Sequence, residues 1–214
     1  MTLTGTAAYD GLDDELPPRV LAAVRVARAE GFPLSCLPGQ GRLLRALAGG
    51  ATRIGETGTG CGVGLAWLAR GAGPDARLVS VECDPDRARL AAGVFAGEPR
   101  VRVRTGDWRD LVEDAPFDLL VLDGGGGSGK TGDPPLDPAR WLRPGGVLVI
   151  DDFTPMDSWP PLIGGEPDTA RLHWLRHPRL LAAEVRVAAS MSTVVATYVG
   201  ASTATPVGVN PDRF

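Results

Sequence analysis

Residues 51–68 read A-T-R-I-G-E-T-G-T-G-C-G-V-G-L-A-W-L, and this stretch decides the fold. A short apolar run breaks into glycines at Gly58, Gly60 and Gly62 and then resumes at helical spacing. Glycine has no Cβ and tolerates positive φ, so a glycine-rich turn lets a ligand approach the backbone closely. The stretch therefore predicts a strand, a ligand-binding turn and a helix, with Glu56 two positions before the first glycine.

Strand and helix patterns alternate beyond this stretch. Strands are expected at residues 53–57, 77–83, 101–105, 117–122 and 147–150, with helices at 61–70, 85–96, 108–113 and 138–142. A helix at 168–176 then precedes strands at 181–188 and 193–199, which a short turn would pair antiparallel. This order predicts an α/β, Rossmann-like doubly wound sheet of seven mostly parallel strands with a C-terminal antiparallel hairpin.

The length of 214 residues suits a single domain. Helices expected at residues 13–30 and 38–48 would form an N-terminal helical cap within residues 1–50, placed to border a substrate entrance. Residues 51–200 are the expected core, and residues 201–214 are the expected C-terminal tail.

Charge and cysteine content limit the partners. A net charge of -4 and a pI near 5.2 offer no basic stripe for nucleic acid. No apolar run approaches the roughly 20 residues that span a bilayer, so no membrane partner is expected. Cys36, Cys61 and Cys83 form no Cys-x-x-Cys pair, which argues against a disulfide framework or zinc site and favours a cytoplasmic location. The sequence leaves a homodimer open.

The glycine turn does not match the dinucleotide fingerprint. In Gly-x-Gly-x-x-Gly, the last glycine would fall on Val63 or Leu65. A carboxylate at Glu56 would also oppose a pyrophosphate, whereas it is favourable beside an ammonium and a sulfonium. The turn therefore favours a cationic cofactor without phosphate, and S-adenosylmethionine is such a ligand.

These motifs resemble those of the class I S-adenosylmethionine-dependent methyltransferases, and the resemblance runs over residues 53–198. It implies that residues 56–62 hold the methionine end of the cofactor. Glu82, with Asp84 as the alternative, would accept the ribose hydroxyls. Asp107 would meet the adenine amino group, and Trp108 would cover the ring. The cofactor contacts implied in this way are Glu56, Thr57, Gly58, Gly60, Gly62, Glu82, Cys83, Asp107, Trp108 and Asp123.

Three acids follow the fourth and fifth expected strands: Asp123, Asp151 and Asp152. Carboxylates that converge at a sheet edge repel one another unless a cation or protonation relieves them, and Mg²⁺ prefers such oxygen ligands. The chain resembles the small metal-dependent O-methyltransferases of the catechol and caffeoyl-CoA type, which implies Mg²⁺ or another divalent cation on these acids. Asp152 stands where that family prefers Asn. The alternative is that Asp123 lines the cofactor pocket while Asp151 and Asp152 cap the following turn.

The same resemblance implies two catalytic residues, Asp123 and a lysine that deprotonates the acceptor hydroxyl. Lys130 is the only lysine and lies seven positions beyond Asp123, farther than the family pattern. A solvated loop lysine is the alternative. Residues 124–131 read G-G-G-G-S-G-K-T and match the phosphate-binding loop pattern. Gly132 and two prolines follow at once, which opposes the helix that this motif needs and favours a flexible substrate-side loop.

His173 and His177 are one helical turn apart, so each is either a general base or helix surface. Trp159 and Trp174 would wall an aromatic substrate, with core packing the expected role of Trp174. The sequence as a whole predicts methyl transfer from S-adenosylmethionine to an oxygen of a small molecule. A nicotinamide-dependent oxidoreductase and a non-catalytic cofactor-binding or scaffold protein of the same fold are the alternatives.

Overall fold

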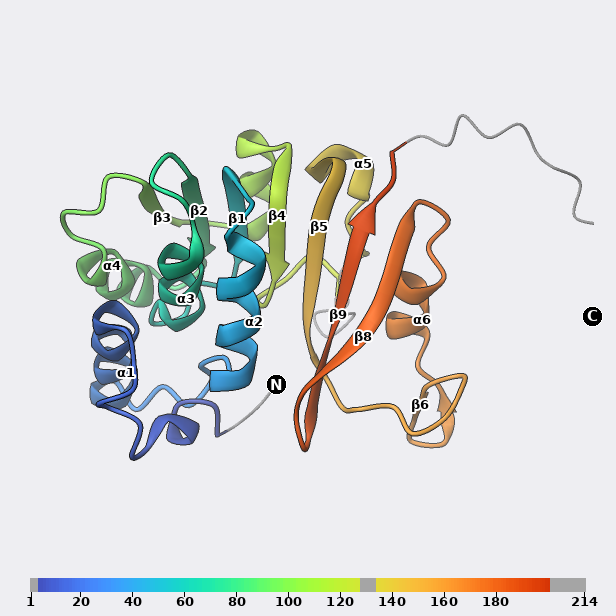
Figure 1. Cartoon of the computed structure of the whole chain (residues 1–214), viewed down its shortest axis with the longest axis horizontal. Coiled ribbons are helices and arrows are strands. Elements are labelled where there is room, and N and C mark those ends of the chain that lie inside the picture. Colours follow the sequence, from blue (N-terminus) through green and yellow to red (C-terminus); the bar gives the residue numbers. More distant parts are fainter. Residues whose placement is uncertain (1–3, 128–133, 201–214) are drawn as a thin grey trace, which may run out of the picture.

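A seven-stranded sheet crosses the computed structural model, which describes residues 4–127 and 134–200 (Figure 1). The strand order is β3-β2-β1-β4-β5-β9-β8. The first five strands are parallel, whereas β9 pairs antiparallel with both β5 and β8. This confirms the predicted fold class. The strands are β1 Arg53–Thr57, β2 Arg77–Glu82, β3 Val101–Thr105, β4 Phe117–Leu122, β5 Leu142–Phe153, β8 Leu180–Ala188 and β9 Met191–Tyr198, with a separate small hairpin of β6 Leu162–Ile163 and β7 Glu166–Pro167.

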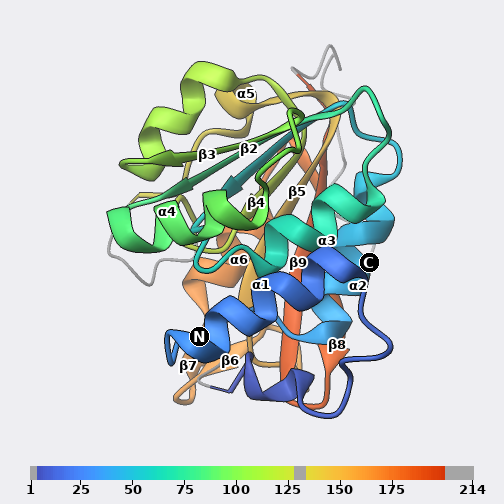
Figure 2. The same cartoon turned by 90° about the vertical axis from the view of Figure 1, so that its left-hand side faces the viewer.

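Helices cover both faces of the sheet (Figure 2). One apolar cluster packs α1, α2 and α3 against the sheet, and the other packs η2, α5 and α6 against the opposite face. Strand β4 serves both clusters, because side chains alternate along a strand: Leu119 and Val121 join the first, Leu120 and Leu122 the second. The helices are η1 Ala7–Tyr9, α1 Pro18–Ala29, α2 Pro38–Ala48, α3 Val63–Gly71, α4 Pro85–Val94, η2 Trp108–Asp114, α5 Pro138–Trp141 and α6 Thr169–Leu175.

Two predicted boundaries were wrong. Helix α1 begins at Pro18 and not at residue 13, because Pro17 precedes a proline and is held extended at φ -55 and ψ 142. Strand β5 is longer than residues 147–150, since Leu142 already pairs with Phe117 and the strand continues to Phe153. Asp151 and Asp152 therefore lie within β5, at the register shift between the Ile150–Val194 and Phe153–Ser192 pairs, and do not follow the strand.

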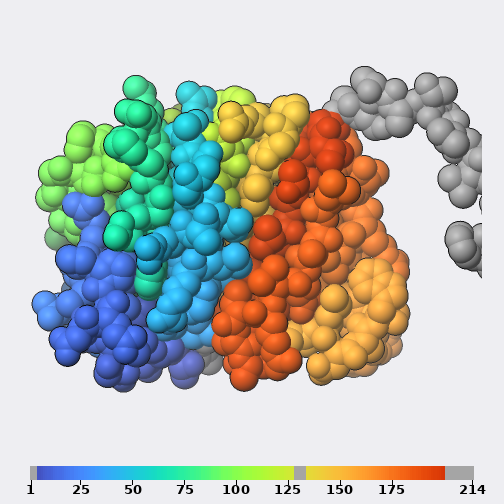
Figure 3. Space-filling view, in the orientation of Figure 1, coloured from blue at the N-terminus to red at the C-terminus, as the bar shows by residue number. Residues whose placement is uncertain are grey.

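Helix α2 lies at the front of the molecule beside the β8–β9 hairpin, and α1 lies on the other side of α2, at the left (Figure 3). Within the described residues, no helix has the length and apolar character needed to cross a bilayer. The N-terminal elements pack directly on α3, which follows the glycine turn. They are thus placed to border whatever the turn binds.

Candidate cofactor site

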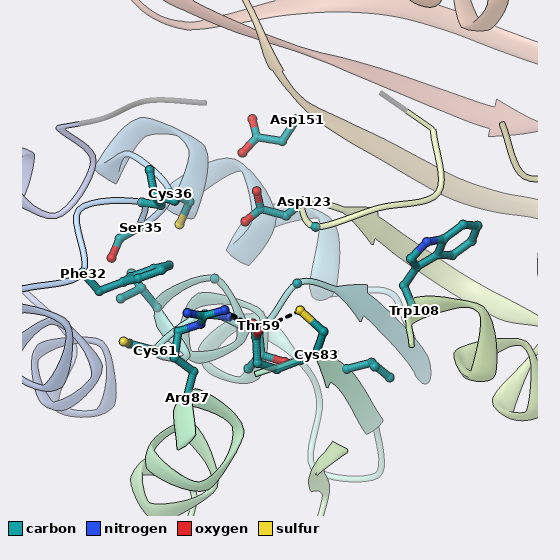
Figure 4. A pocket seen from close by; sticks show the side chains of 18 of the residues that line it. Phe32, Ser35, Cys36, Thr59, Cys61, Cys83, Arg87, Trp108, Asp123 and Asp151 are labelled. Atoms are coloured by element: carbon teal, nitrogen blue, oxygen red, sulfur yellow. Dashed lines mark hydrogen bonds and ion pairs between the residues drawn. The ribbon is translucent and has the colours of Figure 1, made fainter. Parts of the chain in front are cut away.

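A cavity of about 290 Å³ lies at the carboxyl ends of the parallel strands (Figure 4). The strand ends are level there, since Thr57 of β1 pairs with Val81 of β2 and Leu122 of β4. Ligands of open α/β sheets bind outside this edge. The predicted cofactor residues in its lining are Gly58, Gly60, Glu82, Cys83, Asp107, Trp108 and Asp123, and Asp151 and Asp152 line it as well.

The glycine turn is held close to its neighbours by backbone contacts. The amide of Gly58 donates to the carbonyl of Val81 at 2.8 Å, which ties the turn to β2. Gly58 has φ +81, and a Cβ on it would lie 2.4 Å from the Cα of Gly124, which follows β4. Only glycine combines this conformation with this approach. The turn therefore presents bare backbone to the cavity.

Glu82 joins the glycine turn to the end of β2. Its carboxylate accepts hydrogen bonds from the amide of Gly60 at 2.8 Å and from the Arg87 guanidinium at 3.0 Å. The side chain is buried but lines the cavity. The Asp84 amide at 3.0 Å and the Cys83 thiol donate to the same carboxylate oxygen as Arg87, so the oxygen that accepts the Gly60 amide is the one with capacity left for a ligand hydroxyl. Glu82 thus lines the cavity and its ribose role stays a prediction, whereas the alternative Asp84 is outside the cavity lining and caps α4.

Asp107 and Trp108 line the cavity at the end of β3. The Asp107 carboxylate caps η2 through the Arg109 amide at 2.8 Å and also pairs with the Arg109 guanidinium. The hydrogen bond from that amide lowers the pKa of Asp107. Trp108 packs at 5.9 Å from the Trp141 ring. A flat apolar wall next to a hydrogen-bond acceptor suits a purine ring and its amino group.

Three predicted cofactor residues lie behind the cavity lining. Thr57 is fully buried and donates its hydroxyl to the Gly125 carbonyl at 2.8 Å. Gly62 is the N-cap of α3 with φ +89, and a Cβ on it would lie 3.2 Å from the Phe95 ring. Glu56 is buried and accepts a hydrogen bond from the Ser80 hydroxyl at 2.6 Å. These residues lie behind the glycine turn and support its shape. Their direct contact with the cofactor stays a prediction.

The expectation of a charged Glu56 needs correction. Burial raises its pKa to about 8, although the Ser80 hydroxyl lowers it in part and the nearby Glu82 charge raises it further. At neutral pH the carboxyl therefore keeps its proton in most molecules. A neutral Glu56 therefore does not favour a sulfonium over a pyrophosphate. The carboxylates that line the cavity are the remaining groups that could do so.

Replacing Glu56 by glutamine is expected to flatten the dependence of unfolding free energy on pH between about 7 and 8. Folded Glu56 keeps its proton up to a pKa of about 8, whereas the unfolded side chain releases it near its ordinary value. The unfolded state then binds fewer protons, so stability falls as pH rises, by up to about 1.4 kcal/mol per pH unit. Burial lowers the pKa of His173 and of His177, so both have lost their protons in that window.

Urea unfolding of the wild type and of Glu56→Gln across this pH range measures the effect. Equal slopes in the two proteins would show that Glu56 is already ionised in the folded state. The variant should also be the more stable of the two at the upper end of the range, because it has no carboxyl to keep neutral.

The three acids of the predicted metal site share the cavity but do not form a ligand set. The Asp151 carboxylate accepts the amide of Asp152 at 2.7 Å, and Asp152 has a strained positive φ of 71. Across residues 4–127 and 134–200, no three His, Cys, Asp or Glu side chains are grouped closely enough to hold a metal ion. The described acids thus do not fit the divalent ion that the resemblance implies. Lys130 lies outside the described residues.

Comparisons with known proteins agree with this geometry. A family model described as a methyltransferase domain matches residues 56–153. This match identifies residues 56–153 as a methyltransferase domain. A protein of Mycobacterium tuberculosis (strain ATCC 25618 / H37Rv) named "Probable O-methyltransferase" is 32% identical, with 61% of this chain and 62% of that protein covered. The chain thus spans about 62% of the length of this curated relative.

Solved structures extend the likeness over nearly the whole fold. Cofactor-bound Rv0187 from MTB is 26% identical with a TM-score of 0.69, and the match covers 92% of this chain and 98% of that one. An O-methyltransferase from Bacillus cereus in complex with SAH is 24% identical with a TM-score of 0.67, covering 92% and 100%. The second likeness concerns the fold alone. The methyltransferase domain therefore has the architecture that the sequence predicts.

The glycine run after β4 of the methyltransferase domain is packed where it is described. A Cβ on Gly125 would lie 2.5 Å from the Trp108 ring, and one on Gly127 would lie 2.4 Å from the Trp174 ring. The Trp174 indole also donates to the Gly127 carbonyl at 2.7 Å. A Cβ on any of residues 125–127 would meet a tryptophan ring, and one on Gly124 would meet the Gly58 backbone, so the packing favours glycine at all four positions. The flexibility expected of this loop stays a prediction. Residues 128–131 of the phosphate-loop pattern lie outside the described part.

Neither His173 nor His177 is among the residues that line the cavity. Their rings are 5.6 Å apart, and burial lowers the pKa of each. His177 accepts the Arg179 amide at 3.2 Å. Trp174 is fully buried, which confirms core packing, whereas Trp159 is 59% exposed with the Arg176 guanidinium 5.2 Å from its ring. The geometry offers none of these side chains to a ligand in the cavity.

Sequence reasoning missed one wall of the cavity. Residues 32–36, between α1 and α2, contribute Phe32, Leu34, Ser35 and Cys36 to the lining. Figure 4 shows Phe32, Ser35 and Cys36 on one side of the cavity and Trp108 on the other. This wall carries no motif and lies outside the matched methyltransferase domain. Only the general expectation that the N-terminal helices border the entrance pointed to it. Arg87 and Met191, also in the lining, were missed as well.

Proposed function

We propose that the protein transfers a methyl group from S-adenosylmethionine to an oxygen of a small molecule. The observation that carries the proposal is the unit formed by Glu82 and the Gly60 amide at the sheet edge, joined at 2.8 Å. It supports a role for Glu82 as ribose acceptor beside a turn of bare backbone. The methyltransferase domain and the O-methyltransferase relative support the same activity.

The charge of the cavity favours a cationic cofactor. Carboxylates outnumber cations in the described lining, which contains Glu82, Asp107, Asp123, Asp151 and Asp152 against Arg87. Such a lining attracts a sulfonium and an ammonium and repels the phosphates of a dinucleotide. This is the reason to place a nicotinamide-dependent oxidoreductase second.

The chain's own residues would act by positioning. Glu82 and Trp108 would hold the adenosine, and the glycine turn would hold the methionine end. The acceptor oxygen would then lie in line with the sulfonium methyl, on the side of Asp123 and Asp151. Burial raises the pKa of the Cys36 thiol, and the Asp123 and Asp151 charges raise it further, so this thiol is no base at neutral pH. A small-molecule acceptor is the proposed partner, and a homodimer stays a prediction.

Isothermal titration of the protein with S-adenosylmethionine, S-adenosylhomocysteine and NADH tests the cofactor. We expect saturable binding of the first two and none of NADH. Absence of S-adenosylhomocysteine binding would overturn the proposal. Binding without methyl transfer to any of a broad panel of hydroxylated acceptors would favour the non-catalytic alternative, in which the fold is retained and the chemistry lost.

The divalent ion is a separate hypothesis that the described side chains do not support. Titration with Mg²⁺, Mn²⁺ or Ca²⁺, repeated with Asp151→Ala and Asp152→Ala, decides it. Affinity that disappears in both variants would establish the ion at these acids. Equal affinity in the wild type and the variants would reject it.

A further inference from the structure

We propose that Tyr9 is a positioning residue of the cofactor site. It acts through the cavity wall of residues 32–36, which supplies Phe32, Leu34, Ser35 and Cys36 to the lining. The inference rests on the proposed function, since it concerns how tightly that cavity holds the S-adenosyl cofactor. Tyr9 itself lies in η1 near the N-terminus and is outside the lining.

The Tyr9 hydroxyl connects the wall to the helix that follows the glycine turn. It donates to the Cys36 carbonyl at 2.9 Å and accepts the Trp67 indole N–H of α3 at 3.1 Å. Tyr9 and Trp67 are both buried, at 0% and 2% exposure. Burial raises the pKa of Tyr9, so the hydroxyl keeps the proton that it donates. One buried hydroxyl therefore fixes the wall relative to the glycine turn.

Thr6 holds the rest of the wall from the same N-terminal segment. Its hydroxyl lies 2.6 Å from the Phe32 carbonyl and 2.7 Å from the Ser35 hydroxyl, and its amide donates to the Pro33 carbonyl at 3.1 Å. Among the described residues, this segment also donates from the Phe32 amide to the Ala27 carbonyl, and the Cys36 sulfur lies 3.9 Å from the Tyr9 hydroxyl. The N-terminal segment is thus the main support of this side of the cavity.

Removal of the Tyr9 hydroxyl leaves two buried groups, the Trp67 N–H and the Cys36 carbonyl, without this partner. A buried polar group without a partner favours conformations in which water reaches it. Residues 32–36 would then be displaced from the cavity in a fraction of the free molecules. Cofactor binding would have to return them to the bound conformation. Affinity falls in proportion to the fraction of molecules in which the wall is in place.

Calorimetric titration of Tyr9→Phe with S-adenosylhomocysteine tests the proposal, and we expect binding about 5- to 30-fold weaker than in the wild type. Hydrogen exchange supplies a readout specific to positioning. The amides of Phe32, Leu34, Ser35 and Cys36 should exchange faster in the free variant and return to the wild-type rate when S-adenosylhomocysteine saturates it. Trp67→Phe should weaken binding by a similar factor, and the double variant by little more, because both changes break one shared hydrogen bond.

Thr52→Val is the matched control. The Thr52 hydroxyl also donates to a partly buried oxygen, the Asp118 carboxylate at 2.6 Å, but at the other end of β1. Its S-adenosylhomocysteine affinity should equal that of the wild type. If Tyr9→Phe fails to fold, Thr6→Val removes the neighbouring support, and the same weakening is expected. Unchanged affinity in the folded variant overturns the role of Tyr9, whereas absent binding in the wild type overturns the proposed function instead.

Discussion

Replacing Glu82 by alanine is expected to weaken S-adenosylhomocysteine binding at least about a hundredfold. Two ligand hydroxyls would lose a charged acceptor, and hydrogen bonds to charged groups each contribute about 1.5–3 kcal/mol. The Gly60 amide would also lose the acceptor that lies 2.8 Å away, so the glycine turn would be less firmly held. Titration calorimetry of the folded variant measures the loss.

Asp84→Ala is the control, because Asp84 is the other acid that the sequence offers as a ribose acceptor. Its carboxylate accepts the amides of Asp86 and Arg87 at the start of α4. Loss of this cap should lower the midpoint of urea unfolding and leave the affinity for S-adenosylhomocysteine within a few-fold of the wild type. Equal losses of affinity in the two variants would show that the ribose is not held by Glu82 alone.

Gly58→Ala is expected to destabilise the fold by about 3 kcal/mol or more. An alanine at φ +81 would incur the cost of the left-handed region, about 1–2 kcal/mol. Its Cβ would also lie 2.4 Å from the Cα of Gly124, which is backbone and has no rotamer to change. The ends of β1 and β4 would have to separate. Urea unfolding should show a large decrease in the midpoint.

Gly93→Ala provides the opposite case in the same protein. Gly93 is exposed in α4, and a Cβ on it would have no atom within 4 Å. Alanine there should stabilise the protein by about 0.5–1 kcal/mol, because it restricts the unfolded chain. A similar decrease in stability from both glycine substitutions would mean that the contact with Gly124 is not the cause.

The fold could be predicted because local patterns are sufficient for it. Buried strands such as β4 are continuous apolar runs, and the alternation with helices allows few topologies. The start of α1 was missed because three acids ahead of Pro17 and Pro18 resemble a first helical turn, although a residue before proline avoids helical angles. The extent of β5 depends on its pairing with Phe117 and Ser192, which are distant in sequence.

The site was predictable only where a motif ends a strand. Gly58, Glu82 and Trp108 all reach the cavity as the strand order requires. The protonation of Glu56 was not predicted, because its environment includes Ser80, its neighbour on β2. The spacing of residues along one strand does not reveal the partner on the next strand. The wall of residues 32–36 is held by contacts with the N-terminal segment, and such contacts leave no periodic trace in the sequence.

The anchored glycines after β4 have a consequence for engineering. The Gly126 carbonyl accepts the amide of Leu136 at 2.9 Å, so the chain that joins these two residues begins and ends at one place. Thr57 and Trp174 fix that base through the carbonyls of Gly125 and Gly127. Because the entropy of closing a loop grows slowly with its length, segments of different size can be grafted between fixed ends at little cost. Grafting segments of different length there should therefore leave the cofactor half of the cavity intact.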